Sequence, residues 1–78
     1  MAAARLPVTS GQRVVRALMK AGFVLDRIVG SHHVLKHPAD TSRAVSVPCH
    51  GSRDLKAGTL RAIIRQAGFT VEEFSELL

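Results

Sequence analysis

The sequence has one cysteine, no tryptophan and no tyrosine, and its three aromatic residues are all phenylalanine. A single cysteine cannot form an internal disulfide, so a reducing cytoplasm is the expected compartment. The phenylalanines are all candidates for the hydrophobic core. We therefore do not expect aromatic stacking on bases to provide sequence readout in a nucleic-acid complex.

Long apolar segments are missing as well. The longest segment without a charged side chain, residues 44–52, has nine residues, whereas a membrane-spanning helix needs roughly 20 apolar ones. We find no pattern of a secretory signal. A chain of 78 residues is also too small to enclose a deep cofactor-sized cavity. These features predict one small domain with no membrane segment and no cofactor.

Acidic residues are few, with 6 against 11 lysines and arginines, for a net charge of +5. Half of them, Glu72, Glu73 and Glu76, lie near the C-terminal end. Residues 1–71 consequently carry 11 positive and 3 negative side chains, a net charge of +8. Such a chain attracts a polyanion by electrostatic steering. The alternative is a surface charge that only keeps the protein in solution.

Apolar periodicity predicts two main helices. Residues 1–9 have no periodicity and are predicted to be an N-terminal tail, with a single domain over residues 10–78. The first helix is expected to start at the N-cap Ser10 and to end at Gly22. Its predicted apolar stripe contains Val14, Val15, Leu18 and Met19. In the second helix the stripe contains Leu60, Ile63, Ile64 and Ala67, and Gly68 ends it; Thr70 and Glu73 then form a capping box for a short last helix.

Residues between these helices predict a three-stranded antiparallel sheet. The strands are expected at 23–29, 32–37 and 43–47, with a turn at 38–42. Gly30-Ser31 has the composition of a two-residue type II′ hairpin loop, which would pair residue 29 with 32 and residue 28 with 33. The fold class is therefore α+β, in the order α-β-β-β-α followed by a short C-terminal helix.

Four histidines cluster between positions 32 and 50. In the predicted strand, His32 and His33 point to opposite faces and cannot serve one site together. One face holds His32 with Arg27, Val34 and Lys36; the other holds His33 with Ile28, Leu35, His37 and, by simple alternation, Asp26. Composition favours the second face as the core, which leaves His32 accessible. The position of Asp26 keeps that assignment open.

The cluster of four histidines with Cys49 also raises the question of a metal site. Structural zinc needs four convergent ligands, usually from paired short spacings, and a lone cysteine with histidines on alternating faces does not provide them. We expect no metal. His50, next to Cys49, is a candidate second proton carrier, and a solvated loop histidine is the alternative.

Several segments together resemble the HicA (YcfA-like) toxins. In chain order they are Gly30-Ser31-His32, Lys36-His37-Pro38, Val45-Ser46-Val47-Pro48, residues 54–61 (DLKAGTLR) and residues 64–68 (IRQAG). The similarity extends from about Ser10 to Gly68. The sequence departs from the pattern at Ala57, where proline is usual, and at Asp26, where an apolar residue is commoner.

The resemblance implies a fold like that of double-stranded-RNA-binding domains. It also implies an mRNA interferase, the toxin of a type II toxin–antitoxin pair, that a HicB-like antitoxin holds inactive. Because the surface around His32 is cationic, we expect the antitoxin to cover His32. In that family the histidine of the Gly-Ser-His motif is catalytic, which corresponds to His32.

A single imidazole can take the proton of a ribose 2′-hydroxyl and later return it, without a metal. The residues that we expect to contact RNA are Arg27, Ser31, Lys36, Arg43 and Lys56. The alternative function is a non-catalytic RNA-binding domain of the double-stranded type.

Overall fold

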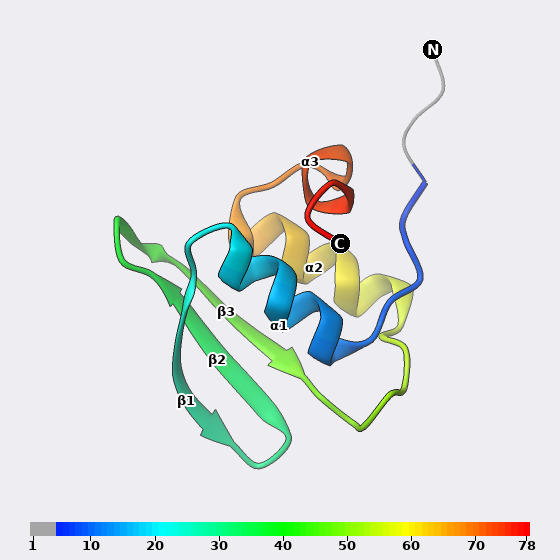
Figure 1. The fold of residues 1–78 in the computed structure, drawn as a ribbon, viewed down its shortest axis with the longest axis horizontal. Helices are drawn as coiled ribbons and strands as arrows, with labels where there is room; N and C mark the ends of the chain where they lie inside the picture. Colours follow the sequence, from blue (N-terminus) through cyan, green and yellow to red (C-terminus); the bar gives the residue numbers. More distant parts are fainter. Residues whose placement is uncertain (1–4) are drawn as a thin grey trace.

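The computed structural model describes residues 5–78. Its elements are α1 (Gly11–Lys20), β1 (Val24–Val29), β2 (His32–His37), β3 (Asp40–Pro48), α2 (Ala57–Ala67) and α3 (Val71–Ser75). The strands form one antiparallel sheet in the order β1-β2-β3 (Figure 1). This is the predicted α+β order, including the short C-terminal helix. Residues 1–4 of the predicted tail lie outside the described part, whereas Thr9 is buried and its carbonyl accepts a hydrogen bond from Leu55 N.

Helix α1 begins and ends where its capping residues predict. The Ser10 hydroxyl accepts a hydrogen bond from Arg13 N at 3.3 Å, and Gly22, with φ of +99°, follows the last turn. Of the predicted stripe, Val14 and Leu18 are buried and Val15 is half-buried. Ala17 is buried, whereas Met19 is 50% exposed because it lies one position beyond the stripe on the helix wheel.

The predicted stripe of α2 is confirmed, since all four of its residues are buried. Gly68 ends this helix in the left-handed conformation, with φ of +84°. The capping box of α3 is also present: Glu73 N donates to Thr70 Oγ1 at 3.1 Å, and Thr70 N donates to Glu73 Oε1 at 2.8 Å. Local sequence chemistry therefore accounts for both ends of α1, for the end of α2 and for the start of α3.

The hairpin between β1 and β2 has the predicted register, with Val29 opposite His32 and Ile28 opposite His33. Gly30 has a φ of +60°, as the first position of a type II′ turn requires. The hairpin thus sets His32 as the first residue of its strand.

A β-bulge between Leu25 and Arg27 corrects the predicted position of Asp26. Simple alternation put Asp26 on the face of Leu35, but the bulge adds one residue to β1 and reverses the alternation there. The Asp26 carboxylate instead pairs with Arg27 and, at 3.6 Å, with Lys36 Nζ. Both cations lie on the face of the sheet that does not carry Leu35. The face that carries Leu35 is therefore not interrupted by Asp26, and it forms the core.

Strand β3 is longer than predicted. The turn contains only Pro38 and Ala39, and the strand begins at Asp40. The Asp40 carboxylate accepts hydrogen bonds from Ser42 N at 3.1 Å and from Ser42 Oγ at 2.6 Å. These bonds, with an irregular register between Leu35 and His37, let turn-forming residues continue into the strand.

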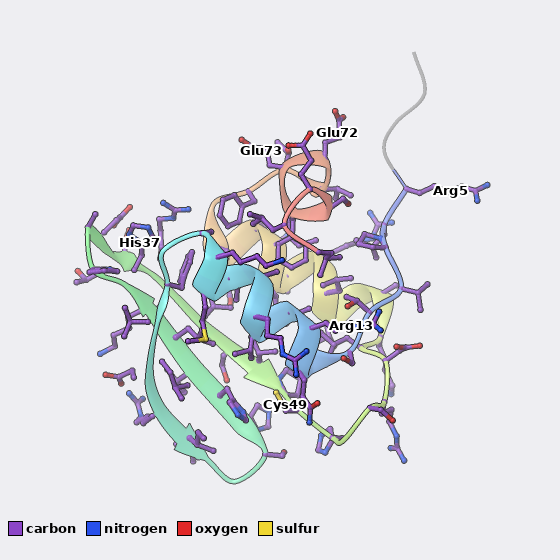
Figure 2. The ribbon with its side chains drawn as sticks, viewed as in Figure 1. Arg5, Arg13, His37, Cys49, Glu72 and Glu73 are labelled. Carbon is purple, nitrogen blue, oxygen red and sulfur yellow. The ribbon has the colours of Figure 1, made fainter. Side chains whose placement is uncertain are left out.

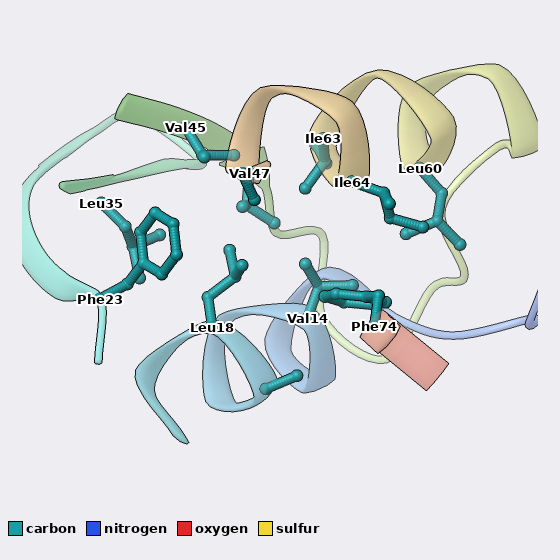
Figure 3. Packing of buried hydrophobic residues seen from close by; sticks show 12 residues of the cluster. Val14, Leu18, Phe23, Leu35, Val45, Val47, Leu60, Ile63, Ile64 and Phe74 are labelled. Carbon is teal, nitrogen blue, oxygen red and sulfur yellow. The ribbon is translucent and has the colours of Figure 1, made fainter. Parts of the chain in front are cut away.

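The core lies between one face of the sheet and the helices (Figure 3). It contains Val14, Ala17, Leu18, Phe23, Leu35, Val45, Val47, Leu60, Ile63, Ile64, Ala67 and Phe74, each at most 2% exposed. The helices pack on the sheet mainly through β3. In the described residues no helix packs over the other face of the sheet, called here the outer face, which carries His32. None of the helices in residues 5–78 is long and apolar enough to cross a membrane.

Candidate functional site

His32 lies on the outer face as the first residue of β2, and its side chain is exposed. Its cross-strand neighbours are Val29 in β1 and Pro48 in β3. These neighbours place the imidazole over the middle strand, where the hairpin loop and the end of β3 hold the backbone on both sides. The accessibility predicted for His32 is confirmed.

A shallow groove of about 590 Å³ connects His32 to helix α2. On the sheet side it is lined by His32, Ser46 and Pro48; on the helix side it is lined by Gly58, Thr59, Ala62, Ile63 and Gln66. The groove is open to solvent along its length, so an extended polymer can enter from the side, which a closed pocket would prevent. Among residues 5–78, His32 is the only titratable side chain that lines it.

The amino-terminal end of α2 contributes positive charge to this groove. Lys56 is the N-cap residue, its side chain makes no capping hydrogen bond, and the first turn contains no acidic residue. The free N–H groups of a first turn and the helix dipole both favour an anion. Gly58 in this turn has open space where a side chain would be. Of the predicted RNA-contacting cations, Lys56 is the one closest in the chain to residues of the groove.

Arg27 and Lys36 are on the outer face, as predicted, and Arg27 lies opposite Val34, two positions along β2 from His32. Lys36 is four residues from His32 along β2, which corresponds to about 13 Å. Both cations are paired with Asp26, which reduces the local positive potential. Lys36 can contact a long substrate at the far end of the sheet, whereas Arg27 lies nearer to His32 on the same face.

Arg43, which we expect to contact RNA, also makes contacts within the fold. Its Nε donates to the carbonyl of Ala67 at 2.7 Å, and its guanidinium lies 5.3 Å from the ring of Phe23 and 5.2 Å from that of Phe69. One of the five N–H donors of the guanidinium is thus used to join β3 to the end of α2. Sequence alternation could not show this, because the partners come from α2 and its following loop.

Ser31 and His50 lie at the same end of the sheet as His32. Cys49 N donates to the Ser31 carbonyl at 2.7 Å, which extends the pairing of β2 and β3 into the loops. His50 follows Cys49 directly and is exposed, whereas Ser31 is half-buried. Figure 2 shows Cys49 and His37 at opposite ends of the sheet. The structure therefore brings the candidate second proton carrier to the end that holds His32.

The two remaining histidines belong to the core side of the sheet. His33 is half-buried, and no hydrogen-bond partner is found for its buried Nδ1 atom. His37 accepts a hydrogen bond from Ala39 N at Nδ1 and packs edge-on against Phe23, with ring centroids 5.0 Å apart. Within residues 5–78, no three histidine, cysteine, aspartate or glutamate side chains converge to hold a metal ion.

Sequence reasoning missed the wall of the groove that α2 forms. Gly58 and Thr59 belong to a segment that resembles the toxin pattern, but nothing in their local sequence indicates that they face His32. Ser46 lies opposite Val34 on the outer face, a placement that strand alternation could have indicated. The approach of α2 to this edge of the sheet depends on packing around Ile63 and cannot be derived from periodicity.

Comparison with known families supports the resemblance. The model of the family described as the HicA toxin of bacterial toxin–antitoxin systems matches residues 11–69, which include the whole sheet and all of α1 and α2. The chain has no match among curated proteins. The matched segment contains every residue that lines the groove.

Proposed function

This chain belongs to the HicA toxin family of toxin–antitoxin systems, and from that premise we propose that it is a metal-independent endoribonuclease that cleaves mRNA in the cytoplasm. The observation that carries the proposal is His32, an exposed imidazole on a groove open enough for a polynucleotide. In this proposal a HicB-like antitoxin inhibits the toxin by covering that groove.

The proposed chemistry uses the nucleophile of the substrate itself. Neutral His32 removes the proton of a ribose 2′-hydroxyl, and the oxygen attacks the adjacent phosphorus. The bond from phosphorus to the 5′-oxygen breaks, and that oxygen receives a proton. The products are a 2′,3′-cyclic phosphate and a 5′-hydroxyl. Because RNA provides the attacking oxygen, no metal-bound water is needed as the nucleophile.

Two neighbouring features support the same reaction. The first turn of α2 offers backbone N–H groups and the positive end of the helix dipole beside the groove, where they would stabilise charge on the phosphoryl oxygens. His50, exposed at the same end of the sheet, can protonate the leaving 5′-oxygen as a second proton carrier. We assign the phosphate to the side of the groove nearest Lys56 and Gly58.

The test compares the wild type with His32→Ala on end-labelled single-stranded RNA in the presence of a chelator. We expect cleavage to fall by about 100-fold or more, with cyclic phosphate ends from the wild type. His33→Gln, on the core side of the same strand, is the matched control, and circular dichroism verifies the fold of each variant. Cleavage by His32→Ala at the wild-type rate would refute the assignment. Salt-dependent binding of duplex RNA without any cleavage would instead support the double-stranded-RNA-binding alternative.

The proposed inhibition is tested by chemical modification of histidines. Diethyl pyrocarbonate reacts with accessible imidazoles, and mass spectrometry separates the peptide of His32 from that of His50. We expect the antitoxin to protect His32 in the complex. A complex in which His32 reacts as fast as in the free toxin would contradict this mode of inhibition.

A further inference from the structure

Strand β1 is an exposed edge of the sheet. All six of its residues are exposed, and four of them are large apolar residues: Val24 at 54%, Leu25 at 37%, Ile28 at 55% and Val29 at 57%. Within residues 5–78 it pairs only with β2, so its other backbone edge has no strand beside it. Figure 1 shows β1 at the margin of the sheet, away from the helices. Apolar edge strands of this kind are templates for pairing with another chain.

The sequence of β1, VLDRIV, has two apolar residues on each side of a central acid–base pair. If two copies pair antiparallel about a two-fold axis between positions 26 and 27, each residue meets a complementary one. Val24 lies opposite Val29 of the second copy, Leu25 opposite Ile28, and Asp26 opposite Arg27. The central charges attract, and the apolar pairs match on both sides of them.

The bulge makes this register sterically consistent. Residues opposite each other in an antiparallel pair must point to the same face, and in a regular strand two residues five positions apart, such as 24 and 29, point to opposite faces. In β1, Leu25 and Ile28 share the core side, opposite Leu35 and His33. The other four residues share the outer face, because the bulge turns the Asp26 carboxylate toward Arg27 and Lys36. The order outer, core, outer, outer, core, outer reads the same from either end.

We propose that β1 pairs with β1 of a second copy of this chain and joins two sheets into one of six strands. Such a contact is isologous, so it uses each exposed edge once and closes the assembly at a dimer. The interface is short compared with the roughly 1,200 Å² or more of stable complexes. The dimer should therefore dissociate on dilution.

The dimer has a geometric consequence for the proposed site. A two-fold axis between antiparallel strands is perpendicular to the sheet, so the outer faces of both copies point the same way. The two His32 grooves would then open on one continuous surface, one on either side of the β1 pair. The pairing itself does not depend on the proposed ribonuclease activity, and the test below measures only association.

Charge exchange at the centre of β1 tests the pairing by sedimentation velocity over a range of protein concentrations. Asp26→Arg places four arginines at the axis and Arg27→Asp places four aspartates there, so each variant alone should be monomeric where the wild type is dimeric. An equimolar mixture of the two should form a heterodimer, because arginines of one chain then face aspartates of the other. The double exchange in one chain restores self-complementarity and should dimerise.

Arg61→Glu, an exposed charge reversal on α2, is the control that should dimerise like the wild type, and circular dichroism verifies each fold. The proposal is overturned if the wild type is monomeric at every concentration. It is equally overturned if the single variants dimerise as the wild type does, or if their mixture stays monomeric. Protection of β1 amides from hydrogen exchange only in the antitoxin complex, with a monomeric free toxin, would assign this edge to the antitoxin instead.

Discussion

Arg43 Nε donates to the carbonyl of Ala67 at 2.7 Å and thereby joins the middle of β3 to the last turn of α2. The acceptor is at the carboxyl end of a helix, where the dipole favours a cation. Gly68 allows this approach, because a Cβ atom there would lie 3.0 Å from Arg43 Nε. The pair matters for function because β3 and α2 are the two walls of the groove.

We expect Arg43→Ala to lower the free energy of unfolding by about 1–3 kcal/mol, since it removes a charge-assisted hydrogen bond and contacts with two aromatic rings. Urea denaturation measures the change. Arg43→Lys keeps the charge but not the planar donor, and should recover only part of the stability. If Arg43→Ala left stability unchanged and weakened RNA binding, Arg43 would be an RNA contact and not a packing residue.

Gly11 should not tolerate a side chain. It is buried at the start of α1, and a Cβ atom there would overlap the carbonyl oxygen of Pro48, the cross-strand neighbour of His32. We expect Gly11→Ala to reduce stability by about 1–3 kcal/mol through overpacking, and to reduce cleavage by moving the end of β3. Gly58→Ala is the control: its Cβ meets no atom within 4 Å, and stability should not fall. Equal stability of Gly11→Ala and the wild type would contradict the packing at this position.

A carboxylate at position 58 should separate stability from activity. Gly58→Asp adds an acid to the first turn of α2, which should stabilise the helix by about 0.5–1 kcal/mol. The same charge would repel a phosphate in the groove and lower cleavage several-fold. Gly58→Asn has the same size without the charge and should cleave nearly as the wild type does. Thermal unfolding and cleavage assays on both variants test the placement of the phosphate; unchanged cleavage by Gly58→Asp would place it elsewhere.

Cys49 should make stability depend on alkaline pH. Burial raises the pKa of its thiol above the ordinary value of 9.0. Above pH 9 the unfolded chain loses this proton while the folded chain keeps it, so stability should fall as the pH rises toward the raised pKa. Urea denaturation between pH 7 and pH 10 measures the slope. Cys49→Ala should lack this contribution, and an identical slope in both proteins would show that the thiol does not provide it.

The helices could be predicted closely from the sequence because their signals are local. Ser10 and Thr70 accept hydrogen bonds from residues three positions later, and Gly22 and Gly68 have the positive φ angles that end helices. The prediction for Met19 was wrong because an apolar side chain can also lie on an exposed flank of a helix.

The sheet was predicted less completely, for two physical reasons. A bulge at Asp26 reverses strand alternation without any unambiguous sign in the sequence, and it changed the face of a charged residue. Around Asp40, side-chain hydrogen bonds let turn residues enter a strand. In both places an aspartate carboxylate finds partners, as ion pairs at Asp26 and as hydrogen bonds at Asp40, where the chain departs from regular strand geometry.

By itself the sequence determined the order of the elements and the hairpin register, since each depends on neighbours a few positions apart. Only the tertiary structure decided that α2 lies along β3 to form the groove, that Arg43 is used for packing, and that the bulge gives β1 a symmetric pattern of faces. The physical reason is that such contacts depend on how the whole core packs. Moving one helix or strand would disturb close packing between residues far apart in the chain, and a local sequence pattern contains no information about those contacts.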